Sequence, residues 1–110
     1  MFLVAHELAH HVQKVVGRFA LLSRKVRSDP AQARTAFLKY ELEADCLAGV
    51  WAAHAQPEGY AQERAAGILS AIDVVGDDKV QQRTSGVVDP NTFTHGSSEQ
   101  RARWFMAGFN

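Results

Sequence analysis

The chain has 110 residues, of which 46% are hydrophobic and 22% are charged, which suits one soluble globular domain with a modest core. Twelve basic residues balance twelve acidic ones without a block of like charge, which argues against a nucleic-acid partner and a polybasic membrane patch. The single cysteine, Cys46, excludes an intrachain disulfide, and no apolar run approaches the roughly 18–20 residues that cross a bilayer. The chain alone is therefore expected to be soluble, and its compartment is left open.

The first predicted helix runs from about Phe2 to Arg27 and contains the motif HExxH at residues 6–10. Positions four apart lie on one face of a helix, about 6 Å apart along its axis, so His6 and His10 can share one Zn²⁺. Glu7 lies about 100° round the helix, where it can reach a water on that metal as a general base. The helix prediction rests on an apolar period formed by Phe2, Leu3, Val4, Leu8, Val12, Val16 and Phe19.

Two other residues of this helix have less specific interpretations. Gly17 lowers the helix propensity by about 1 kcal/mol relative to alanine and indicates close packing against a neighbour. His11 points about 100° away from the face of the two motif histidines and is interpreted as a surface or supporting residue. The alternative for the motif itself is an accidental match, with both histidines facing solvent.

A second helix is predicted from about Pro30 to Ala55. Asp29 can cap it, and proline is favoured at the first helical position. Glu41 and Asp45 are four apart and share one face, whereas Glu43 projects to a different side. Because the connection between the two helices is short, an antiparallel hairpin is expected, which returns Glu41 toward the histidines. The core candidates of this helix are Phe37, Leu38, Leu42, Leu47 and Trp51.

The remaining chain predicts smaller helices and one long loop. A third helix is expected from Glu58 or Tyr60 to about Val75, followed by a short helical piece at Lys79–Gln82. Residues 83–96 are irregular, and a loop of this length is often functional; it delivers His95. Ser97 and Gln100 form a capping box for a last helix. The predicted fold is all-α: a helical hairpin carrying HExxH and ExxxD, plus two or three further helices.

The predicted zinc site needs a third protein ligand besides the two histidines. The metzincin pattern is excluded, because Gln13 and Val16 stand where it requires glycine and histidine. Glu41 is the predicted third ligand, which completes a two-His-one-Glu set. Asp45 is predicted to accept the second ring N–H of a ligating histidine. The weaker candidates for the third ligand are Glu43, His54 and His95.

This residue set predicts hydrolysis by an activated water. Zinc lowers the pKa of its bound water, and Glu7 takes the proton as the water attacks a carbonyl carbon. His95 or Arg101 could stabilise the oxyanion that forms; the alternative for both is to anchor the loop. The alternative for Glu41 and Asp45 taken alone is a solvated acidic helix face.

Together these segments resemble the neutral zinc metallopeptidases of bacteria. The resemblance implies that His6, His10 and Glu41 bind zinc and that the motif glutamate is catalytic. The spacing Glu-x-x-x-Asp, followed by a histidine six residues before an arginine, is also similar to that of CAAX-processing membrane proteases. The matching segments are His6–Gln13, Glu41–Ala52, Ile72–Gln81 and Thr94–Arg101.

Members of this family resemble the chain only in their C-terminal part. They usually carry an N-terminal membrane-spanning segment, which implies a bacterial, membrane-anchored location. Position 43 often holds glutamine in them, and its glutamate here supports a non-ligand role. Residues 1–110 are therefore expected to form the C-terminal, zinc-binding part of a larger metallopeptidase domain.

The expected function is zinc-dependent hydrolysis of peptide bonds in a peptide or protein substrate. One alternative is a non-catalytic zinc-binding helical module, or a truncated and inactive peptidase; it predicts zinc binding without cleavage. A second alternative is a structural or interaction domain in which the two histidines and Glu41 are surface residues; it predicts no zinc.

Overall fold

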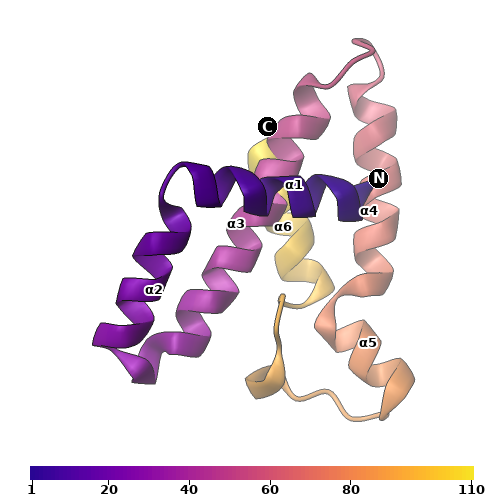
Figure 1. The fold of residues 1–110 in the computed structure, drawn as a ribbon. Coiled ribbons are helices and arrows are strands. Elements are labelled where there is room, and N and C mark those ends of the chain that lie inside the picture. The colour runs from indigo at the N-terminus through magenta and orange to yellow at the C-terminus, as the bar shows by residue number, and fades with distance from the viewer.

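The computed structural model describes residues 1–110, and all its regular elements are helical, which confirms the all-α prediction. The central helix is α3, which contacts α1, α2, α4 and α6 (Figure 1). No helix combines the length and apolar character needed to cross a membrane. The helices are α1 (Phe2–Val15), α2 (Arg18–Ser28), α3 (Ala33–His54), α4 (Ala61–Val75), α5 (Asp77–Thr84) and α6 (Ser98–Phe109), with 3₁₀ turns at Pro30–Gln32 and Pro90–Thr92.

The prediction of a single helix from residue 2 to residue 27 is wrong, because the chain bends at Gly17. This glycine has φ 87°, a left-handed conformation that glycine adopts without strain. A Cβ atom added to it would meet nothing within 4 Å, so the predicted close packing is also wrong. The role of Gly17 is to let the backbone turn between α1 and α2.

This bend sets the register of the predicted zinc ligands. At about 1.5 Å per residue, His10 lies about 28 Å along the chain from a turn at Asp29, whereas Glu41 lies only about 18 Å from it. In a straight hairpin the two side chains would therefore miss each other by about 10 Å. In the structure only α2 and α3 form the hairpin, and α1 leaves it to cross α3 (Figure 1), which brings His10 level with Glu41.

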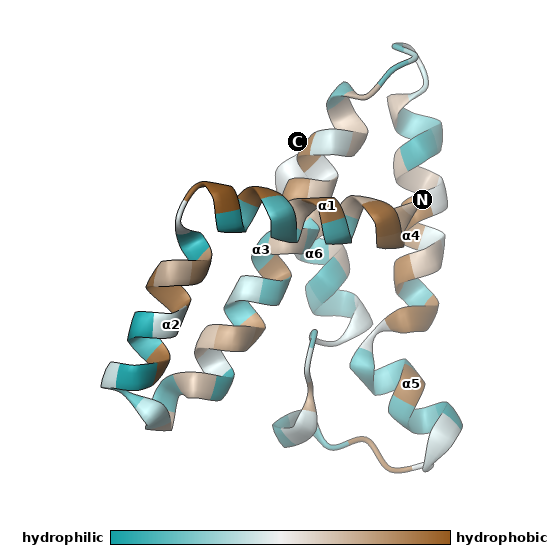
Figure 2. Cartoon of the chain, in the orientation of Figure 1, coloured by the Kyte–Doolittle hydropathy of each residue, from teal (hydrophilic) through white to brown (hydrophobic).

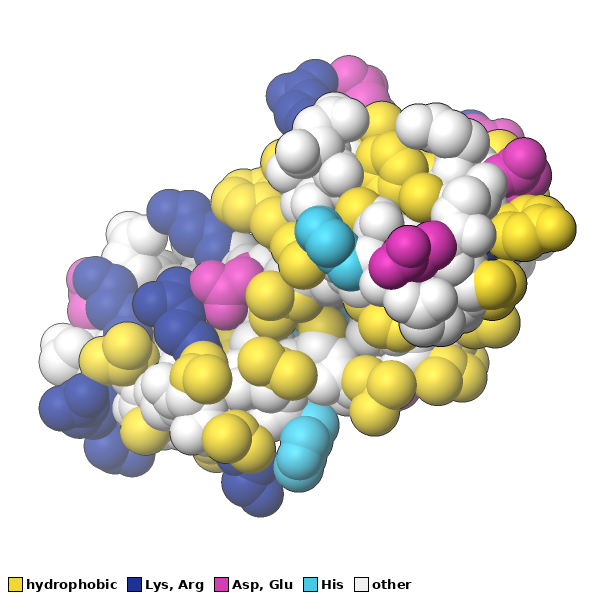
Figure 3. Space-filling model, turned by 90° about the horizontal axis from the view of Figure 1, so that it is seen from above, with side chains coloured by type: hydrophobic (Ala, Val, Ile, Leu, Met, Phe, Trp, Pro, Cys, Tyr) yellow, Lys and Arg dark blue, Asp and Glu magenta, His cyan; other side chains and the backbone are white.

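The face of α1 that packs is not the one that the apolar period indicates. Its buried residues are Phe2, Ala5, His6, Ala9 and Gln13. Apart from Phe2, the residues of the predicted stripe are exposed, with Leu3 at 69% and Val12 at 46%. The two alanines let α1 lie close against α3, and the aliphatic side chains remain on its outer side. Figure 2 shows that α1 carries hydrophobic residues along much of its length, and Figure 3 shows hydrophobic side chains at the molecular surface.

Helices α3 and α6 approach each other closely through two glycines. A Cβ atom on Gly49 would overlap the carbonyl oxygen of Phe105, and one on Gly108 would overlap that of Cys46. This contact joins the C-terminal half of α6 to α3. The hydrophobic core around it comprises Phe2, Ala5, Ala48, Ala52, Ala65, Ile68, Ile72 and Phe105.

The later elements follow the predictions with small shifts. Helix α4 begins at Ala61, and the predicted short piece at 79–82 is longer, as α5. The capping box of α6 is confirmed: the backbone N–H of Gln100 donates to Ser97 Oγ at 3.1 Å, and that of Ser97 donates to Gln100 Oε1 at 2.9 Å. The long loop contains the 3₁₀ turn and ends at His95, beside α3.

Candidate metal centre

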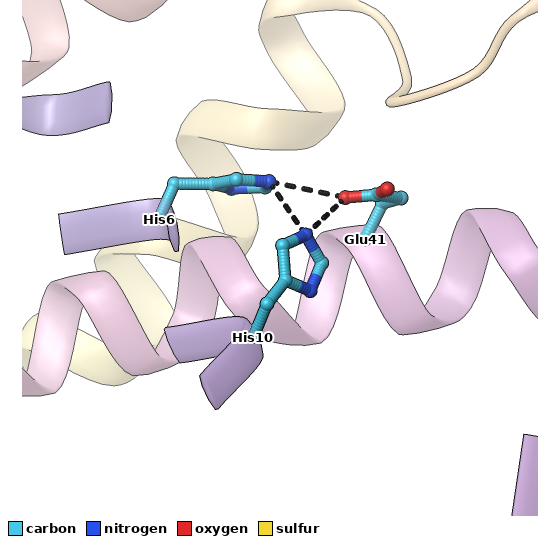
Figure 4. Close-up of side chains that lie close together, drawn as sticks. All are labelled: His6, His10 and Glu41. Carbon is cyan, nitrogen blue, oxygen red and sulfur yellow. Dashed lines mark hydrogen bonds and ion pairs between the residues drawn. The ribbon is translucent and has the colours of Figure 1, made fainter. Parts of the chain in front are cut away.

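Three side chains from two helices converge on one point (Figure 4). His6 and His10 come from α1, and Glu41 comes from α3. The Nε2 atoms of the histidines are 3.0 Å apart, and they lie 3.0 and 2.8 Å from Glu41 Oε2. The structure thus brings together the three residues that the sequence analysis singled out as ligands.

The outer nitrogen of each histidine ring is held by a hydrogen-bond acceptor. His6 Nδ1 lies 2.8 Å from Asp45 Oδ1, and a carboxylate can only accept. His10 Nδ1 lies 2.8 Å from Gln13 Oε1, whose amide nitrogen already donates to the Tyr40 carbonyl. Both Nδ1 atoms therefore carry hydrogen, and in neutral rings both Nε2 lone pairs face the centre.

A divalent cation fits this arrangement. Two imidazole lone pairs and a carboxylate oxygen repel one another unless positive charge lies between them. A tetrahedral zinc about 2.0–2.1 Å from each donor would hold them about 3.3 Å apart. The observed separations of 2.8–3.0 Å are only a few tenths of an ångström shorter. Two histidines and one glutamate are also a donor set of catalytic zinc sites.

The metal-free centre binds protons instead. Burial lowers the pKa of His6, but hydrogen bonds to Asp45 and Glu41, with the charge of Asp45, outweigh it and raise the pKa from 6.5 to about 9. Burial raises the pKa of Glu41, but its hydrogen bond to His6 and the nearby His10 and His95 lower it below the usual range. The carboxylate is thus ionised at neutral pH and available to a cation.

Zinc is expected to stabilise the fold more as the pH rises. A group whose folded pKa is raised contributes stability below its unfolded pKa of 6.5, and this is lost as the pH rises through the folded value of about 9. The metal-free chain should therefore lose stability across this interval, whereas zinc needs the deprotonated His6 ring and takes the proton's place. Melting temperatures of chelator-treated and zinc-loaded protein at pH 6.5 and pH 9 test this. A zinc-induced shift that is the same at both pH values would contradict it.

Behind His6, a fully buried carboxylate connects three helices. Asp45 accepts two hydrogen bonds from Arg101 of α6, from Nε at 2.8 Å and from a terminal nitrogen at 3.0 Å. The guanidinium also lies 5.1 Å from the centre of the Phe2 ring. Because Arg101 stands on the Nδ1 side of His6, away from the converging atoms, it is not placed to stabilise an oxyanion there. Its position is that of a support for Asp45.

The two predicted catalytic side chains differ in what they contact. Glu7 is exposed on α1 and makes no hydrogen bond or ion pair. His95 Nε2 lies 3.9 Å from Glu41 Oε2, and its ring centre is 5.8 Å from that of His6. The competing ligands lie elsewhere: Glu43 pairs with Arg18 at 2.8 Å, and His54 is exposed.

Sequence reasoning missed three residues that position these groups. Gln13, fully buried, orients His10, and Tyr40 stacks on the same ring with centres 5.2 Å apart. Asp77 Oδ2 accepts the backbone N–H groups of residues 94, 95 and 96 and so holds His95 in place. Gln13 has a sequence signal, since it lies three residues after His10 on one helix face. Asp77 has none that separates it from an ordinary turn residue.

A family described as "Putative neutral zinc metallopeptidase" matches residues 1–110 of the chain. The chain belongs to this family. An uncharacterized protein of Escherichia coli K12, YpfJ, is 40% identical over 118 residues, which cover 99% of this chain and 39% of that protein. An uncharacterized protein of Mycobacterium tuberculosis H37Rv, Rv2575, is 38% identical over 119 residues, covering 98% and 39%. The chain thus spans about two fifths of these relatives, whose names assign no activity. No solved structure matches it significantly.

Proposed function

We propose that this neutral zinc metallopeptidase family member binds one zinc ion through His6, His10 and Glu41 and hydrolyses peptide bonds. Bound zinc supplies an electrophile that polarises a carbonyl group and acidifies a water molecule. The observation that supports the proposal best is the convergence of three donor atoms, two of which belong to histidine rings whose outer hydrogen bonds leave the Nε2 lone pairs directed at the same point. Asp45 and Gln13 keep the two rings in the tautomer that a metal requires.

Glu7 is the proposed general base. It follows His6 directly on α1, and its exposed carboxylate has no competing partner. It would accept the proton of the attacking water and pass it to the leaving amine. The amine leaves only once it is protonated. Glu7 must therefore reach the substrate nitrogen as well as the water.

His95 is the proposed donor to the oxyanion. The Thr94 hydroxyl donates to Asp77 Oδ1 at 3.3 Å, so its oxygen accepts from His95 Nδ1 at 2.8 Å. His95 Nε2 therefore carries a hydrogen only when the ring is positively charged. In that form the ring would donate to the oxyanion and stabilise its developing negative charge.

The substitution Glu7→Gln tests the base. The variant should keep one zinc per chain, because Glu7 is not a ligand, and should lose about 10²- to 10⁴-fold in peptide hydrolysis. Zinc content and cleavage of casein or a mixed peptide library are the measurements. Glu41→Ala is the matched comparison and should lose zinc affinity. Full activity of Glu7→Gln would reject the proposed base, and unchanged zinc affinity of Glu41→Ala would reject the third ligand.

One observation favours a second candidate, a zinc-binding helical module without catalysis. The chain corresponds to only 39% of the length of the relatives described above. Residues outside the matched part would then complete the substrate cleft in longer members. Zinc bound near one ion per chain without any peptide cleavage would support this candidate. Cleavage by the 110-residue chain would exclude it.

A further inference from the structure

A surface cavity adjoins the metal centre on the side of Glu41. Its volume is about 290 Å³, and it lies between the first half of α3 and the end of the long loop. Glu41 belongs both to the cavity wall and to the converging triad. A group placed at the triad and a side chain placed in the cavity would therefore be neighbours. The lining residues are Arg34, Phe37, Leu38, Glu41, Phe93 and Thr94.

The walls of this cavity are mainly apolar. Phe37 was predicted to lie in the core, but its side chain is 49% exposed. It precedes Glu41 by one helical turn and so lies on the same face of α3 as that carboxylate. Phe93 forms the opposite wall from the loop. An exposed aromatic residue in a concave apolar site is a typical contact for an apolar ligand group.

Three polar residues also line the cavity. Glu41 Oε2 faces the two histidines, and the Arg34 guanidinium donates to the backbone carbonyl of Phe93 at 3.2 Å. The next backbone N–H, that of Thr94, donates to Asp77 at 2.8 Å. The loop wall is thus held in place on both sides of Phe93, and the Arg34 guanidinium, which forms no ion pair, takes part in holding it.

We propose that this cavity binds the side chain of the residue next to the scissile bond, so that the enzyme selects peptides with a bulky aliphatic or aromatic residue at that position. The proposal rests on the proposed peptidase function, because it uses the triad to place the substrate carbonyl. Phe37, Phe93 and Leu38 are the specificity-determining residues. Their contact area favours leucine or phenylalanine over glycine by about 10- to 100-fold in affinity.

Binding of peptide hydroxamates to the zinc-loaded chain tests this proposal. These probes hold zinc through the hydroxamate, and a series with glycine, leucine or phenylalanine next to it differs only in the side chain offered to the cavity. Calorimetry should show the leucine and phenylalanine probes binding about 10- to 100-fold more tightly than the glycine probe. Phe37→Ala and Phe93→Ala should each reduce this ratio severalfold. Zinc content and helical circular dichroism report whether each variant is folded.

Leu21→Ala is the matched control. Leu21 is 48% exposed on α2, close to the value for Phe37, and it does not line the cavity. Its removal should leave the ratio between probes unchanged. Equal affinity of the three probes, or a preference that persists in both phenylalanine variants, would overturn the proposal.

The same series separates this proposal from the proposed function. A side-chain preference that depends on Phe37, found without cleavage of any peptide, would reject the peptidase reaction and retain the apolar subsite. Peptide cleavage with no preference among the probes would retain the peptidase reaction and reject the apolar subsite. If the chain binds no zinc and none of the probes, both proposals fail together.

Discussion

Replacing Asp45 with alanine is expected to lower the free energy of unfolding by about 3–5 kcal/mol. Asp45 is fully buried and is the shared partner of His6 and Arg101. Its removal leaves a buried guanidinium without a counter-charge, because Arg101 is itself only 6% exposed. The same change should weaken zinc binding about 10- to 100-fold, since His6 loses the acceptor that orients it.

Urea denaturation of the metal-free protein and zinc competition with a chelator measure the two effects of this variant. Glu99→Ala is the matched control, because Glu99 is also a carboxylate paired with an arginine, Arg103, but is exposed. Such surface pairs contribute little to stability. Similar unfolding curves for Asp45→Ala and Glu99→Ala would show that the buried network does not hold the helices together.

Adding a methyl group at Gly49 or Gly108 is expected to destabilise the fold by about 1–3 kcal/mol or more. Each new Cβ atom would meet a backbone carbonyl, of Phe105 or of Cys46, and not a flexible side chain that could move aside. Helices α3 and α6 must then separate, which also draws Arg101 away from Asp45. We therefore expect both variants to bind zinc more weakly, although neither glycine touches the centre.

The control for these variants is Gly67→Ala. Gly67 lies inside α4, and a Cβ atom there would meet nothing within 4 Å. Alanine should stabilise that helix by about 0.5–1 kcal/mol and leave zinc affinity unchanged. Thermal melts and zinc titrations of the three variants provide the comparison. If all three behave alike, close approach of α3 and α6 is not what limits substitution at Gly49 and Gly108.

The four-residue spacing of the two motifs explains why the candidate ligands could be predicted from the sequence. HExxH and ExxxD each place their two residues four apart, so each helix presents a defined pair of side chains whatever surrounds it. The family membership and the helical fold follow from the same local patterns. The convergence of His6, His10 and Glu41 depends in addition on tertiary structure. The antiparallel hairpin was expected to include the whole first predicted helix, whereas in the structure only its second part, α2, pairs with α3.

The remaining differences arise where one residue type serves two purposes. Glycine at position 17 suits both close packing and a left-handed turn, and only the structure distinguishes them. Helix α1 is apolar on several sides, so its pattern does not reveal that Ala5 and Ala9, the small residues, form the contact with α3. Asp77 acts on residues 94–96, which are distant in sequence, and no local pattern indicates this contact.

The bend at Gly17 makes the geometry of the candidate metal centre independent of the length of the hairpin that α2 and α3 form, here called the α2–α3 arm. His6 and His10 precede the bend, and Glu41 lies well beyond the tip of the arm, where Ser28 and Pro30 are exposed. Equal extensions of α2 and α3 would move the tip outward and leave the crossing of α1 over α3 where it is (Figure 1). Exposed turns of this kind tolerate inserted sequence. The tip at Asp29 is thus the natural place to attach a label or a second domain for following the centre without disturbing it.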